Sequence, residues 1–170
     1  AYFYPDGEPL AVGDVRDNPD YAETLRRVAT EGTDAFYKGE IPEAIVAALA
    51  EEPRPGALSV EDIESYEVKV RPPLCGEWRD YRICSAPPPS SGGITQNAIT
   101  GLYDRLIDES VTEPEQRVRA FVDAQRLAYA DRDHYVADAD FVQVPTADLI
   151  NPTYLDVRAT EVFEPSVTPP

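Results

Sequence analysis

The stretch Leu74-Cys-Gly-Glu-Trp-Arg-Asp-Tyr-Arg-Ile-Cys-Ser-Ala-Pro-Pro-Pro-Ser-Ser-Gly-Gly93 decides the fold, because it leads from a β-hairpin into a helix. β-Favouring residues flank Arg79-Asp80, and a two-residue turn there pairs Cys75 with Cys84. This pair falls on a non-hydrogen-bonded position, where Cα atoms lie about 4.5 Å apart and a cross-strand disulfide is possible. The alternative is a pair of small buried thiols on neighbouring strands. A disulfide would indicate folding in an oxidising compartment.

The turn Ser90-Ser91-Gly92-Gly93 is the most site-like feature of the sequence. Hydroxyls and free backbone N–H groups at a helix N-terminus can hold an anion or a carboxylate, so Ser90, Ser91, Gly92 and Gly93 are candidate substrate-binding residues. The competing interpretation is an ordinary helix entry, with serine as the cap and glycine supplying backbone freedom, and it is the favoured one. The Gly-x-x-x-x-Gly-Lys-Ser/Thr pattern of a phosphate-binding loop is absent.

Helical patterns surround the hairpin, which predicts a mostly helical α+β fold. Asn18 as N-cap, Pro19 in the first turn and Gly32 at the stop indicate a helix, and its Tyr21, Leu25 and Val28 predict a buried stripe. The alternation over 66–71 predicts a half-buried strand that leads into the hairpin. Further helices are predicted over 40–52, 59–66, 94–109 and 113–133, with short helical turns after Pro145.

Composition limits the class of protein. The chain has 170 residues and 42% apolar content, which predicts one compact domain over 1–170 with a flexible Pro-rich tail at 163–170. Its formal charge of -17 would repel nucleic acid and anionic membranes, and no apolar run is long enough to span a bilayer. Methionine is absent, so we expect that a segment upstream of Ala1 was removed.

Residues near the end of the last long helix offer a second place for chemistry. His134 is the only histidine and has aspartates beside it, but no motif joins it to a nucleophile. The acids Asp131, Asp133, Asp138 and Asp140 do not follow the spacing of a calcium loop, and a solvated acidic corner is favoured. Two cysteines and one distant histidine do not form the usual zinc ligand set. We therefore predict no metal and no cofactor.

Motifs spread over nearly the whole chain resemble the γ-glutamyltransferase family. They occur in the family's order at 13–25, 32–41, 87–93, 124–132 and 138–145, and include Pro87-Pro-Pro-Ser-Ser-Gly-Gly93 and Ala124-Gln-Arg-Leu-Ala-Tyr-Ala-Asp-Arg132. One departure lies in the hairpin, where Arg79-Asp80 replaces the family's Arg-Gly. Asp tolerates a positive φ less well than Gly, so we expect a less comfortable turn.

The resemblance implies the four-layer αββα architecture of the N-terminal-nucleophile hydrolases, and a precursor that cuts itself into a large and a small subunit. A Thr at the start of the small subunit would be the nucleophile, with its own amine as base. It would transfer a γ-glutamyl group to water, an amino acid or a peptide. The present chain would be the C-terminal portion of the large subunit, without a catalytic residue and inactive alone. Its partners would be the small catalytic subunit, the upstream large-subunit segment and a γ-glutamyl peptide substrate.

Two other functions stay open at this point. Relatives on the same scaffold deacylate cephalosporin side chains, and similarity of fold does not choose between the substrates. From a different class, the chain could be a noncatalytic helical module that binds a partner through its acidic face. The family and the possible disulfide lead us to expect a periplasmic or extracellular location.

Overall fold

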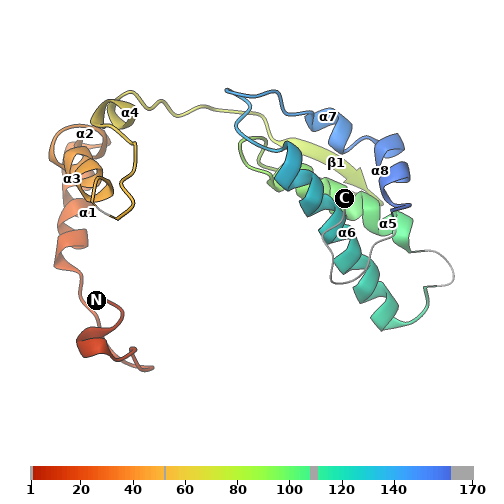
Figure 1. Cartoon of the computed structure of the whole chain (residues 1–170), viewed down its shortest axis with the longest axis horizontal. Coiled ribbons are helices and arrows are strands. Elements are labelled where there is room, and N and C mark those ends of the chain that lie inside the picture. Colours follow the sequence, from red (N-terminus) through yellow and green to blue (C-terminus); the bar gives the residue numbers. More distant parts are fainter. Residues whose placement is uncertain (1, 52, 108–110, 162–170) are drawn as a thin grey trace. The chain divides into compact units, whose positions relative to one another are not determined.

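The computed structural model describes residues 2–51, 53–107 and 111–161 (Figure 1). The predicted tail at 163–170 lies outside these residues. Contacts within the chain divide it into two compact units, 1–69 and 70–170, and each is described by itself. No helix in the described part combines the length and apolar character that crossing a membrane requires.

The first unit consists of short helical elements. Asn18 caps α1 by accepting a hydrogen bond from the Tyr21 backbone N–H at 2.9 Å, and Ser59 and Asp62 form a capping box at the start of α4. Hydrogen bonds from Ser59 lower the pKa of Asp62. The helices predicted at these two starts are confirmed. The elements of this unit are η1 (Pro5–Gly7), α1 (Pro19–Glu31), α2 (Asp34–Tyr37), α3 (Glu40–Leu49) and α4 (Val60–Glu64).

The predicted burial of the apolar stripe on α1 is wrong for the described chain. Tyr21 is 60% exposed and Leu25 is 51% exposed, while Val28 is half-buried. Within the unit α1 packs mainly on α2, whose 4 residues are too few to cover the face of a 13-residue helix. The unit therefore does not supply a layer that covers this stripe.

The strand predicted over 66–71 is also wrong. These residues form no strand, and Val68 and Val70 are 76% and 97% exposed. A strand requires a neighbour with which to exchange backbone hydrogen bonds. Among the described residues the sheet has two strands, paired with each other, and neither pairs with this segment.

The second unit begins with the hairpin, whose predicted register is confirmed. Strands β1 (Leu74–Trp78) and β2 (Tyr81–Ser85) are antiparallel, and Cys75 lies opposite Cys84. The two cysteines are joined by a disulfide, with their Cα atoms 4.1 Å apart.

From the sequence we expected a positive φ at Asp80. The structure places the positive φ of the turn at Arg79 instead, at 55°. Two hydrogen bonds hold Arg79 in place, from its Nε at 3.2 Å and its Nη2 at 2.7 Å to one carboxylate oxygen of Asp104. Its guanidinium also lies over the Trp78 ring, 4.6 Å from the ring centroid. These contacts offset the cost of a positive φ at a residue with a side chain.

Helix α5 is central to the second unit, since it contacts the hairpin, α6, α7 and α8 (Figure 1). The observed helices are α5 (Gly92–Leu106), α6 (Pro114–Tyr135), α7 (Thr146–Leu149) and α8 (Pro152–Arg158). Their buried apolar side chains form one core, made of Ala98, Leu102, Ala124, Leu127, Ala128 and Leu155. Two long helices and a hairpin around this core confirm the predicted mostly helical α+β class.

Candidate functional site

The turn at Ser90–Gly93 joins the hairpin to α5 and is the strongest site candidate from the sequence. The Ser90 backbone N–H donates to the Pro87 carbonyl at 3.0 Å, and the Gly93 N–H donates to the Ala86 carbonyl at 2.9 Å. The Ser90 hydroxyl accepts from the Gly92 N–H at 3.2 Å. The amides of Gly92 and Gly93 are therefore already used within the chain, which favours the helix entry, although the N-cap residue Ser91 makes no side-chain capping hydrogen bond.

Close packing fixes the position of this turn. A Cβ on Gly93 would lie 2.8 Å from the Ala86 carbonyl oxygen and 2.8 Å from the Leu74 Cβ, so only glycine fits there. The buried Asn97 side chain donates to the Gly93 carbonyl at 2.8 Å and lies against Gly76 of β1. The glycines thus bring α5 against the hairpin.

The two serine hydroxyls of the turn lie on its outer side. Ser90 is exposed, and the Ser91 hydroxyl accepts a long hydrogen bond of 3.4 Å from Arg132 Nε of α6. No general base hydrogen-bonds to either serine among the described residues. His134 is exposed at the end of α6, and its ring contacts Tyr135 edge to face at 4.5 Å. The structure does not join His134 to Ser90 or Ser91.

The acids near the end of α6 already have partners within the chain. Asp133 pairs with Arg132 at 2.6 Å, and Asp140 pairs with Arg71 at 2.7 Å. The Asp138 carboxylate accepts from the Asp140 backbone N–H at 3.0 Å. In the described part of the chain, no three His, Cys, Asp or Glu side chains lie close enough together to hold a metal ion.

A buried ion pair between α6 and α8 was not anticipated from the sequence. Arg158 Nη2 lies 2.9 Å from Asp131 Oδ1, and the two side chains are 10% and 8% exposed. Burial, together with a hydrogen bond to Asp131, raises the pKa of Tyr154 to about 12. A signal was present, because Asp131 continues the core-facing stripe of Ala124 and Leu127 at helical spacing.

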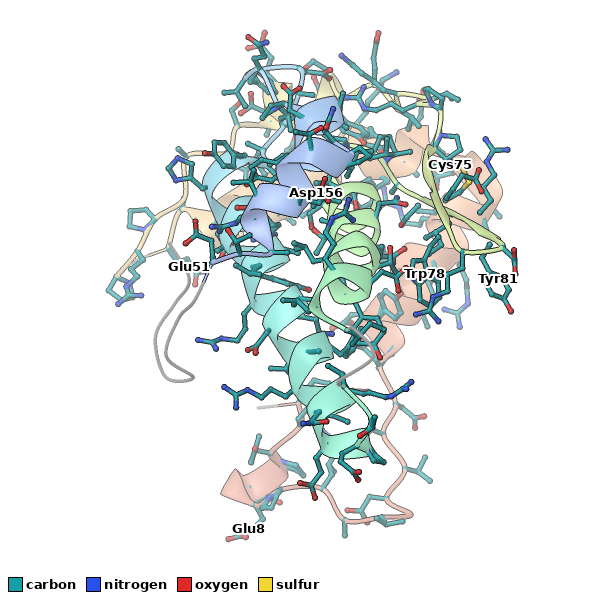
Figure 2. All side chains as sticks on the ribbon, turned by 90° about the vertical axis from the view of Figure 1, so that its right-hand side faces the viewer. Glu8, Glu51, Cys75, Trp78, Tyr81 and Asp156 are labelled. Carbon is teal, nitrogen blue, oxygen red and sulfur yellow. A yellow bond between two sulfur atoms is a disulfide. The ribbon has the colours of Figure 1, made fainter. Side chains whose placement is uncertain are left out.

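A second arginine, Arg105 of α5, contacts α8. Arg105 pairs with Asp156 at 2.6 Å, and it also donates to the Pro152 carbonyl at 3.1 Å. Leu155 packs beside Gly101, where a Cβ would lie 2.6 Å from the Leu155 Cδ1. Figure 2 shows Asp156 on α8 in front of the two long helices. This 7-residue helix is too short to be stable alone, so these contacts set its position.

Comparisons with known proteins agree on one family. The family model described as gamma-glutamyltranspeptidase matches residues 1–170. The "Glutathione hydrolase proenzyme" of Escherichia coli (strain K12) is 34% identical over 163 residues, which cover 95% of this chain and 28% of that protein. The "Acylase ACY 1 proenzyme" of Pseudomonas sp. (strain SE83) is 37% identical over 162 residues, which cover 93% of this chain and 28% of that protein.

Among solved structures, Helicobacter pylori gamma-glutamyltranspeptidase matches with a TM-score of 0.76 and 35% identity, over 93% of this chain and 45% of that one. The chain spans about 28% of the length of the curated relatives named above. The family match covers every residue, and the fold of the solved relative agrees with it. The chain therefore belongs to the gamma-glutamyltranspeptidase family.

Proposed function

We propose that the chain is the C-terminal portion of the large subunit of a γ-glutamyltransferase or glutathione hydrolase that is made as a self-cleaving precursor. The observation that carries the proposal is the family match over all 170 residues. The proenzyme names of the relatives support processing into two subunits. In this proposal the Thr nucleophile and its oxyanion-stabilising donors come from the small subunit.

The contribution of this chain is structural support. The hydroxyls of Ser90 and Ser91 have no base beside them in the described structure, and the Gly92 and Gly93 amides are used internally. A role for this turn in substrate binding stays a prediction. The partners we propose are the small catalytic subunit, the upstream large-subunit segment and a γ-glutamyl peptide substrate. The disulfide supports a periplasmic or extracellular location.

Deacylation of a cephalosporin or another amide, as in an acylase, is the second candidate. The identity of 37% to an acylase proenzyme is as high as the identity to glutathione hydrolases, so the sequence of this portion favours neither substrate. A noncatalytic module is disfavoured, because the named relatives that match nearly all of the chain are enzyme precursors.

Turnover by the full-length precursor tests the proposal. The purified protein should release p-nitroaniline from γ-glutamyl-p-nitroanilide, and the isolated 170-residue chain should release none. A cephalosporin bearing an amide side chain is the comparison substrate. Preference for the cephalosporin would favour the acylase alternative. Absence of turnover on both substrates, in a folded and correctly cleaved protein, would refute an enzymatic function.

A further inference from the structure

The hairpin carries its disulfide on the face that points away from α5. Successive side chains of a strand point to opposite faces. Gly76 lies against Asn97 of α5, so the neighbouring Cys75 and its partner Cys84 belong to the other face. Figure 2 shows Cys75 on this hairpin. In the described structure Cys84 is exposed and Cys75 is half-buried, so Cys84 is the more accessible of the two.

Residues beside the two cysteines hold the turn that leads into α5. Leu74 precedes Cys75, and its Cβ lies 2.8 Å from where a Cβ on Gly93 would be. Ala86 follows Cys84 by two positions, and its carbonyl accepts a hydrogen bond from the Gly93 backbone N–H at 2.9 Å. The disulfide therefore joins the two strands beside the residues that contact the turn.

The disulfide also closes the open end of the hairpin. Among the described residues the hairpin is a two-stranded sheet, and its pairing ends at Leu74 and Ser85, one pair beyond the cysteines. A two-stranded hairpin is only marginally stable by itself in water. Opening the disulfide should therefore loosen this end first, and with it the contact between Leu74 and Gly93.

We propose that Cys84 is a site of disulfide exchange with a small peptide thiol, of which glutathione is the example, and that the exchange loosens the turn. The proposal rests on the proposed function for the source of the thiol, because a glutathione hydrolase meets glutathione as its substrate. Exchange depends on access to the sulfur that is attacked, and Cys84 is the accessible residue of the pair. The concentration of the thiol then sets the fraction of molecules with an open disulfide.

The exchange balances without a separate oxidant. The glutathione thiol loses a proton, and its thiolate attacks the Cys84 Sγ. A new sulfur–sulfur bond forms there while the bond to the Cys75 Sγ breaks, and Cys75 leaves as a thiolate that takes up a proton. Attack of a second glutathione thiolate on the mixed disulfide leaves both cysteines reduced and joins the two glutathione molecules as a disulfide.

Mass spectrometry of the full-length protein tests the site of exchange. The native protein is incubated with an excess of reduced glutathione, and free thiols are then blocked with N-ethylmaleimide. Cys84 should carry glutathione, or the cysteinylglycine that hydrolysis would leave, and Cys75 should carry the maleimide. Absence of an adduct in the folded protein, or an adduct mainly on Cys75, would overturn the proposal.

Two matched variants compare the two positions without the disulfide. Cys75→Ser leaves Cys84 as the free thiol, and Cys84→Ser leaves Cys75. With oxidised glutathione, Cys75→Ser should form its adduct about threefold faster or more, because the remaining thiol is the exposed one. Equal rates in the two folded variants would contradict exchange at Cys84.

Hydrogen exchange of the full-length protein tests the effect on the turn. After treatment with glutathione, the amides over 86–97 should exchange about tenfold faster than in the oxidised protein. The control is the part of α6 that contains Ala124, Leu127 and Ala128, which belongs to the core and should keep its exchange rate. Equal exchange over 86–97 in the two states would refute the effect on the turn.

These measurements separate the inference from the proposed function, because neither the adduct nor hydrogen exchange requires turnover. A protein that forms the adduct on Cys84 but neither cleaves itself nor releases p-nitroaniline would refute the proposed function alone. An active, cleaved enzyme whose disulfide stays closed in glutathione would refute the exchange alone.

Discussion

Neutralising Asp131 should destabilise the second unit far more than breaking a surface ion pair. Asp131 and Arg158 are almost fully buried, with one contact of 2.9 Å between them. Asp131→Asn keeps the shape of the side chain but leaves the Arg158 charge buried without a counter-charge. Removing one partner of a buried pair costs about 3–5 kcal/mol, and we expect the lower end because the amide oxygen still accepts a hydrogen bond.

The pair itself should contribute little net stability. Asp131 Oδ2 and Arg158 Nε have no hydrogen-bond partner in the described structure, so the desolvation of both charges is only partly offset. A double variant, Asp131→Leu with Arg158→Met, should therefore stay within about 1–2 kcal/mol of wild type. The two changes should be strongly coupled, with each single variant costing more than the double.

Urea denaturation of the 170-residue chain, followed by circular dichroism, measures these differences. The control is Glu23→Gln, which breaks the exposed pair with Arg26 at 3.2 Å and should cost less than about 1 kcal/mol. If Asp131→Asn cost no more than this control, the pair would not be buried in solution. A destabilised double variant would show that the charges are themselves net stabilising.

Three further predictions concern the turn, the tyrosine and the hairpin. Gly93→Ala should cost about 1–2 kcal/mol in urea denaturation, because the methyl would lie 2.8 Å from a backbone carbonyl, whereas Gly56→Ala meets only ordinary contacts and should be near neutral. Because the pKa of Tyr154 is raised to about 12 in the folded chain, the unfolded chain loses this proton first, near pH 10. The contribution of Tyr154 to stability should be constant below about pH 10 and fall between pH 10 and 12, and Tyr154→Phe should remove this part of the fall. Cys75 and Cys84 are 9 positions apart in the sequence, and replacing both with serine removes the disulfide that closes this loop. The free energy of unfolding should fall by about 2–3 kcal/mol. An unchanged urea midpoint would mean that the disulfide does not form in solution.

The local structure of the chain could be predicted well from its sequence. The hairpin register followed from counting outward from one two-residue turn, since strand pairing fixes every later partner. Helix starts followed from side chains that cap their own backbone, as Asn18 and Ser59 do. These are interactions between residues close in the sequence, and they do not depend on the rest of the protein.

Burial could not be predicted in the same way, because it depends on what lies across from a side chain. Tyr21, Leu25, Val68 and Val70 all fit apolar patterns and are all exposed in the described structure. A periodic pattern identifies a face but not the element that covers it.

Contacts between residues far apart in the sequence could not be predicted at the candidate site either. The sequence analysis placed Asp131 in a solvated acidic corner, which is wrong because Asp131 is buried, and nothing in the local pattern connects it to Arg158 on a short helix. The turn at Ser90–Gly93 looked site-like because serines and glycines serve both helix entries and anion sites, and only the positions of the hydrogen bonds separate the two. In the proposed function, the nucleophile lies on residues outside this chain.

Intact-mass analysis of the purified full-length protein, with sequencing of each amino terminus, tests the central proposal most directly. We predict two polypeptides, of which the larger contains this chain and the smaller begins with Thr. Substitution of that Thr by Ala should leave a single uncut precursor. A wild-type protein that stays as one folded polypeptide, or a second polypeptide that begins with a residue other than a nucleophile, would contradict the proposal.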